Sequence, residues 1–161
     1  MTRRLILPAV LLLTLAGCSS STPDDGSTAA PTETTEQSAE QVTCEGFYEG
    51  TGTPLADRAD DARTALTGGE VEDGAPYTEV NALEQRIREL GEDAPSELAG
   101  LLEDVNAPFT EAVAAVNEAR SQEVPEGEEP AFPDLSQIDV SGSEDAQAEF
   151  QSACSDAGYG A

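Results

Sequence analysis

The stretch from Pro95 to Arg120, PSELAGLLEDVNAPFTEAVAAVNEAR, decides the fold of this 161-residue chain. Its large apolar residues recur at spacings of three and four, which is the period of one face of an α-helix. Pro108 removes one backbone donor inside the stretch, but the apolar phase continues on both sides of it. We therefore expect one kinked helix rather than two separate helices. Its apolar face consists of Leu98, Leu101, Leu102, Val105, Phe109, Val113 and Val116.

Three shorter stretches show the same period. One runs from Leu55 to Leu66, with Pro54 in its first turn, Thr53 as its cap and Gly68-Gly69 at its end. A second helix, closed by Gly91, is predicted by Tyr77, Val80, Leu83, Ile87 and Leu90. The last one, with Ser141 and Glu144 as a capping box, is predicted by Ala146, Phe150, Ala153, Cys154 and Ala157.

The sequence therefore predicts an all-α fold, a small bundle of about four helices. Val, Ile and Thr never alternate with polar residues over a useful length, so strands are not expected. The stretch from Ser121 to Gly142 is rich in Pro, Gly and Glu, and we expect a long acidic loop before the last helix. Because long bare loops are uncommon in compact domains, we expect this loop to pack back onto the bundle rather than act as a binding lid. Its apolar contacts would be Leu135, Ile138 and Val140.

The beginning of the chain carries a targeting pattern. Arg3 and Arg4 precede an apolar run from Leu5 to Ala16, which is too short to span a bilayer. The run closes on Leu15-Ala16-Gly17-Cys18, and this motif resembles the lipobox of bacterial lipoproteins. The resemblance implies cleavage between Gly17 and Cys18 and a diacylglyceryl group on Cys18. It covers this segment only and implies nothing about the rest of the chain.

These observations predict three parts of the chain. Residues 1–17 form a signal peptide, exported by the general or, given the two arginines, the twin-arginine route. Residues 18–43 contain the lipidated Cys18 and a disordered tether rich in Ser, Thr, Pro and Glu. Residues 44–161 form a single acidic helical domain. The expected location is the outer face of the bacterial cytoplasmic membrane, held by a lipid anchor.

Two cysteines remain once Cys18 is assigned to the anchor. Cys44 and Cys154 lie near the two ends of the predicted domain. In an exported protein such a pair most commonly forms a disulfide. A reactive thiol is the other interpretation, but the sequence places no activating base near either residue.

The charge balance is extreme, with 33 acidic residues against seven arginines and no lysine. Removal of the first 17 residues leaves five arginines and a formal charge of −28. Nucleic-acid binding and docking on anionic headgroups both need cationic contacts, so neither is expected. A solvated surface of the kind seen in exported actinobacterial proteins, which this chain resembles in composition, explains the acidity. Adaptation to salt, a basic partner or a divalent cation would explain it too.

Catalytic and metal sites are not expected either. The chain has no histidine, which removes His-based zinc and di-iron sites and the Ser-His-Asp triad. It also lacks tryptophan and any glycine-rich phosphate loop. Weak Ca²⁺ binding was considered for two acidic groups, but neither fits an EF-hand loop, so no metal site is predicted. These groups are Asp57, Asp60 and Asp61, and Glu70, Glu72 and Asp73.

We therefore expect a non-enzymatic lipoprotein of the cell envelope that needs no cofactor. The leading interpretation is an interaction or structural module that meets another exported protein or the cell wall. The alternative is a module that binds a small ligand or a divalent cation, because helical bundles also enclose ligand sites. The lipid bilayer, reached through Cys18, is the one partner that a motif supports.

Overall fold

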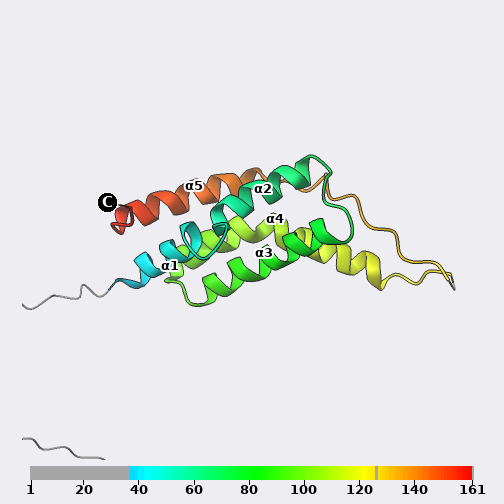
Figure 1. Cartoon of the computed structure of the whole chain (residues 1–161), viewed down its shortest axis with the longest axis horizontal. Helices are drawn as coiled ribbons and strands as arrows, with labels where there is room; N and C mark the ends of the chain where they lie inside the picture. The colour runs from blue at the N-terminus through cyan, green and yellow to red at the C-terminus, as the bar shows by residue number, and fades with distance from the viewer. Residues whose placement is uncertain (1–36, 126, 161) are drawn as a thin grey trace, which may run out of the picture. The chain divides into compact units, whose positions relative to one another are not determined.

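The computed structural model describes residues 37–125 and 127–160, which form five α-helices and no strand (Figure 1). This confirms the all-α class, with one helix more than expected. No helix in these residues has the length and apolar character needed to cross a membrane. The helices are α1 (Ala39–Tyr48), α2 (Leu55–Thr67), α3 (Ala75–Glu92), α4 (Ser96–Ser121) and α5 (Ser141–Asp156).

The additional helix is α1, which extends N-terminally beyond the domain boundary predicted at Cys44. It opens with a capping box: the Ser38 hydroxyl accepts the Gln41 N–H, and the Gln41 side chain accepts the Ser38 N–H, each at 3.2 Å. A helix of ten residues has little stability alone. Its apolar pattern is also too short to predict a helix from the sequence. Burial of Cys44 and Phe47, both 0% exposed, holds it in place.

Two predicted helix caps are wrong. The N-cap of α2 is Pro54 rather than Thr53: the Pro54 carbonyl accepts the Arg58 N–H at 3.1 Å, and no side chain caps the helix. At α5 the predicted capping box of Ser141 and Glu144 does not form, because Val140 takes the N-cap position. The side chain of Asp139 instead binds the first residue of the helix: its Oδ1 accepts hydrogen bonds from the Ser141 N–H at 3.0 Å and from the Ser141 hydroxyl at 2.8 Å.

The two longest helices, α3 and α4, follow the predicted pattern with one difference. Gly91 does not close α3, since the helix continues to Glu92 and Asp93 is its C-cap. A Cβ at Gly91 would lie 3.9 Å from the Leu102 Cβ of α4, an ordinary van der Waals contact. As expected, α4 is one helix that continues through Pro108.

The core is arranged around α4. This helix makes its most extensive contacts with α3 and α5, which run antiparallel to it (Figure 1). α1 contacts α2, α3 and α5, and α2 also contacts α3. All five helices contribute to one hydrophobic core. The largest fully buried side chains are Phe47, Leu66, Leu83, Ile87, Leu102, Val105, Phe109, Val116 and Phe150, with the two half-cystines.

The long loop between α4 and α5 packs back onto the bundle at its second half, as predicted. Leu135, Ile138 and Val140 are all less than 9% exposed. Phe132 lies edge-on to Tyr77, with 5.8 Å between the ring centroids. The guanidinium of Arg120 also lies over the Tyr77 ring, 4.9 Å from its centroid.

Candidate interaction surface

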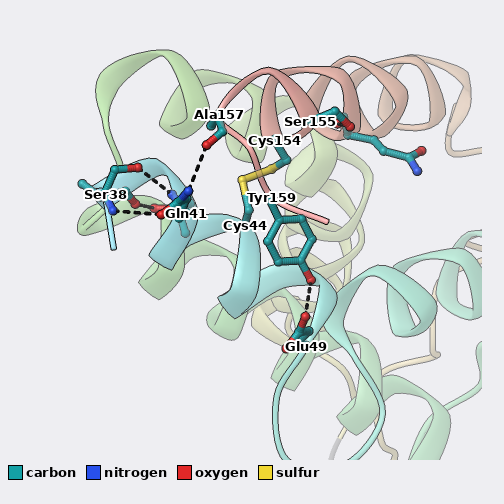
Figure 2. The surroundings of a disulfide bond; sticks show 11 residues. Ser38, Gln41, Cys44, Glu49, Cys154, Ser155, Ala157 and Tyr159 are labelled. Atoms are coloured by element: carbon teal, nitrogen blue, oxygen red, sulfur yellow. Dashed lines mark hydrogen bonds between the residues drawn. A yellow bond between two sulfur atoms is a disulfide. The ribbon is translucent and has the colours of Figure 1, made fainter. Parts of the chain in front are cut away.

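The site residues predicted from the sequence fall into two groups. Gly17 and Cys18, the predicted cleavage and lipidation residues, lie outside the described residues. Cys44 and Cys154 form the predicted disulfide, with their Cα atoms 5.7 Å apart. The disulfide joins α1 to α5 (Figure 2).

The surroundings of the disulfide show how α1 is fixed to the C-terminal end of α5. One turn before Cys44, the Gln41 Nε2 donates to the Ala157 carbonyl at 3.1 Å, so Gln41 both caps α1 and links it to α5 (Figure 2). One turn after Cys44, Phe47 contacts Phe150 with 5.0 Å between the ring centroids. The two helices therefore meet through successive contacts on either side of the covalent bond.

Two tyrosines extend this cluster. Tyr48 and Tyr159 stack with 5.9 Å between their centroids, and the Tyr159 hydroxyl donates to Glu49 at 2.8 Å (Figure 2). Burial, with repulsion from Asp60 and Tyr159, raises the pKa of Tyr48 to about 12. Burial and the bond to Glu49 raise the pKa of Tyr159 to about 12. Both rings therefore stay protonated near neutral pH, and neither offers a phenolate for chemistry.

A buried arginine links α2 to α5. Arg63 is 4% exposed and donates to Ser143 Oγ at 3.0 Å, to Gln147 Oε1 at 2.8 Å and to Asp60. Ser143 in turn donates to the Val105 carbonyl of α4 at 2.6 Å. Asp60, one of the residues considered for Ca²⁺ binding, is thus an ion-pair partner of Arg63. This network joins three helices through satisfied polar groups, and its geometry is that of a structural element.

Asp73, a member of the second acidic group, is also engaged in contacts within the fold. Asp73 accepts from Arg120 at 2.8 Å and from the Gly74 N–H at 2.9 Å. Within residues 37–125 and 127–160, no three His, Cys, Asp or Glu side chains are arranged to hold a metal ion. The acidic side chains of the described structure therefore form no ready-made cation cage.

An exposed polar surface lies on the outward side of α4. It consists of residues that are exposed or half-buried and lie opposite the apolar stripe of the same helix. Small uncharged side chains alternate here with carboxylates. We call this surface the α4 face, and define it as Ser96, Ala99, Gly100, Glu103, Asp104, Ala107, Thr110, Glu111 and Ala114.

Hollows flank the α4 face on both sides. Between α3 and α4 lies a groove of about 920 Å³, the α3–α4 groove, which all nine residues of the α4 face line. Toward α5 lie two smaller hollows of about 560 and 400 Å³. Asp104 lines all three, so they belong to one continuous surface.

This surface is strongly anionic. Among the described residues, Arg88 is the one basic residue that lines it, and it pairs with Glu84 at 3.5 Å and Glu92 at 3.1 Å. Ten carboxylates line the three hollows: Glu84, Glu92, Glu97, Glu103, Asp104, Glu111, Asp139, Asp145, Glu149 and Asp156. Such a surface attracts cations and cationic segments and repels another copy of this acidic chain.

One buried polar atom on the wall of the α3–α4 groove lacks a partner. Asn106 is 5% exposed, and its Nδ2 donates to the Glu84 carbonyl at 3.1 Å. Its Oδ1 accepts no hydrogen bond in the structure. An unsatisfied buried acceptor is unusual in a folded protein and calls for an explanation.

Sequence reasoning did not identify this surface. Apolar periodicity shows which side of α4 is buried, but it does not show whether another element covers the opposite side. One pattern could have drawn attention to it: Gly100, Ala107 and Ala114 are spaced by seven residues and mark a narrow strip of small side chains.

No protein-family model, curated protein or solved structure matches the chain.

Proposed function

We propose that this protein is a non-catalytic interaction module of the bacterial cell envelope, anchored through Cys18 and binding a cationic segment of another exported or cell-wall-associated protein. The observation that carries the proposal is the α4 face with its flanking hollows. Ten carboxylates and one arginine surround a strip of small residues that the rest of the fold leaves open. Charge complementarity of this kind selects partners and speeds their encounter.

The anchor supports this role. The sequence between Cys18 and α1 is rich in Ser, Thr, Pro and Glu. This is the segment whose composition predicts a tether between the anchor and the domain. A domain on such a tether stays near the membrane and samples the adjacent layer. Its negative charge keeps it away from anionic headgroups.

The test is site-specific photo-cross-linking in the native cell. A photoreactive residue replaces Ala107 on the α4 face, and a matched protein carries it at Ala148, an exposed position of α5 outside the three hollows of the α4 face. We expect position 107, but not position 148, to capture an exported partner through a peptide rich in Lys or Arg. Equal capture at both positions, or none at position 107, would overturn the proposal.

A second arm separates the competing occupants. If the α4 face binds a small ligand or a divalent cation instead, position 107 captures no protein. The melting temperature would then rise on adding that ligand beyond the rise in matched NaCl. Replacing Cys18 with Ala tests the anchor itself, and we expect the variant to remain unprocessed or to leave the membrane fraction. A Cys18→Ala protein that still fractionates as a cleaved membrane protein would contradict lipidation.

A further inference from the structure

We infer that the α3–α4 groove receives a basic amphipathic α-helix lying along α4. This inference rests on the proposed function and makes it more specific, because it names the conformation and chemistry of the partner segment. Four observations carry it: the length of the groove, the small residues along its floor, its unpaired carboxylates and the unpartnered Asn106 Oδ1.

The length of the groove favours a linear partner. The lining residues of α4 extend from Ser96 to Ala114. At 1.5 Å per residue this corresponds to about 27 Å, or five helical turns. A compact small molecule would occupy a fraction of this length. A helix of about 18 residues would cover it entirely, as in other helix-in-groove complexes.

The floor permits close approach of a helix backbone. Gly100, Ala107 and Ala114 recur every seven residues, so they follow one side of α4. Helices pack with their axes 8–10 Å apart, about the lower value where the side chains at the contact are small. Gly91 and Ala99 further reduce the bulk at the end of the groove where α3 passes into α4.

The charges specify a basic partner. Glu103, Asp104 and Glu111 line the groove and form no ion pair with any described residue. Glu84 and Glu92 add two carboxylates from α3 and share Arg88. Lysines or arginines on the flanks of an incoming helix would pair with the three free carboxylates. A second copy of this chain would bring further negative charge and is disfavoured.

Asn106 supplies an independent indication of a ligand. Its side chain is buried and fixed at Nδ2, which donates to the Glu84 carbonyl, while Oδ1 has no donor. Oδ1 is itself buried, and Asn106 lines the groove, so a hydroxyl, amide or ammonium group of the partner supplies that donor once the side chain turns toward the groove. The position lies midway along the groove, between Gly100 and Ala114, where a central residue of the partner helix would contact α4.

The test uses the mature protein as purified from cells that produce it, with two synthetic 18-residue peptides. One peptide carries Lys on one face and Ala and Leu on the other. The second has the same composition in a scrambled order without an apolar face. We expect the amphipathic peptide to bind at least tenfold more tightly at physiological salt. Amide chemical shifts should change along Ser96–Ala114 and not at Ala148.

Two matched variants locate the contact. Ala107→Arg places a bulky cation in the groove, and Ala148→Arg makes the same charge change on α5 outside it. Both positions are exposed in the middle of a helix, so neither change disrupts the core. We expect Ala107→Arg to weaken binding of the amphipathic peptide at least tenfold and Ala148→Arg to weaken it less than twofold.

The outcomes separate this inference from the proposed function. Equal binding of the two peptides would show that charge alone matters, which overturns the helical occupant and leaves an acidic interaction module standing. Equal weakening by both arginine variants would overturn the groove as the location. Failure of the amphipathic peptide to bind would overturn the inference, while cross-linking at position 107 would still decide whether the α4 face has a protein partner.

Discussion

The disulfide end of the bundle and the α4 face are opposite kinds of surface in one small protein. At the disulfide end, α1 and α5 are joined by a covalent bond, by the contact of Phe47 with Phe150 and by the hydrogen bond from Gln41 to Ala157. At the α4 face, small side chains and carboxylates point outward. Glu103, Asp104 and Glu111 there form no ion pair with a described residue.

If the α4 face binds a cationic partner as proposed, stability and binding belong to separate places in this protein. A chain with 33 acidic residues repels itself, and this repulsion opposes compaction. The disulfide and the Arg63 network offset that repulsion away from the α4 face. Carboxylates on the α4 face can therefore remain without ion-pair partners. Changes at the disulfide end should therefore affect folding, and changes on the α4 face should affect binding.

The largest effect is expected from removing the disulfide. Cys44 and Cys154 are 110 residues apart in sequence. The chain-entropy model gives about 4–5 kcal/mol for a loop of this length. The double variant Cys44→Ala, Cys154→Ala should lose about that much free energy of unfolding in urea titrations, and wild type under reducing conditions should match it. A loss below about 1 kcal/mol would show that the noncovalent contacts alone hold α1.

The Arg63 network should give the next largest effect, and its two halves should differ. Asp60→Ala removes the carboxylate partner of a buried guanidinium and should cost about 2 kcal/mol, less than in a fully buried pair because the Asp60 side chain is 62% exposed. Arg63→Met removes the buried charge itself and fills similar volume, so it should cost about 1 kcal/mol. Urea unfolding of both variants tests the order. Equal costs would mean that the other acceptors, Ser143 and Gln147, already satisfy the guanidinium.

On the α4 face, a glycine substitution should raise stability. A Cβ at Gly100 meets nothing within 4 Å, so Gly100→Ala should gain about 0.5–1 kcal/mol from helix propensity. Gly46 is the matched helical glycine of α1, and a Cβ there would lie 2.8 Å from the Leu90 Cδ1. Gly46→Ala should therefore gain less than Gly100→Ala in thermal unfolding. A larger gain at Gly46 would contradict the contrast between the covered and the open surface.

The smallest effect concerns the start of α5 and depends on pH. Bonds from the Ser141 N–H and the Ser141 hydroxyl hold the pKa of Asp139 below its ordinary value. A lowered pKa in the folded state stabilises the protein above the ordinary pKa, 3.8, and this contribution disappears as the pH falls through the folded value. Asp139→Ala should lower the melting temperature slightly at pH 7 and leave it unchanged near pH 2. A difference that persists at pH 2 would show that charge is not the cause.

Much of the fold follows from local sequence. The stripe from Leu98 to Val116 is continuous enough to predict a single helix through Pro108, which the structure has. The two cysteines remaining in the domain make the Cys44–Cys154 pair the one intramolecular choice. The buried positions Leu135, Ile138 and Val140 in the long loop were predictable because apolar residues must be covered even where no helix is formed.

Local sequence does not predict the conformation of a segment that is decided by contacts with residues elsewhere in the chain. α1 is short, and its apolar face is stabilised only by packing against other helices, including Phe150 and Cys154 of α5. The N-cap of α5 is Val140 rather than Ser141, because Val140 is packed in the core and fixes where the first turn begins, and Asp139 accepts the hydrogen bonds of Ser141. Competition of this kind among adjacent polar residues is settled by packing rather than by propensity.

The sequence by itself determined the helical class, the paired cysteines and the acidity, because each depends on composition or on spacing along the chain. Only the tertiary structure decided that α4 lies between α3 and α5, that its outward side is left open, and that Asn106 is buried there with an unpartnered oxygen. The physical reason is that apolar periodicity records which face of a helix leaves water. How the whole chain packs decides which helices cover the buried face and which carboxylates line the outward face.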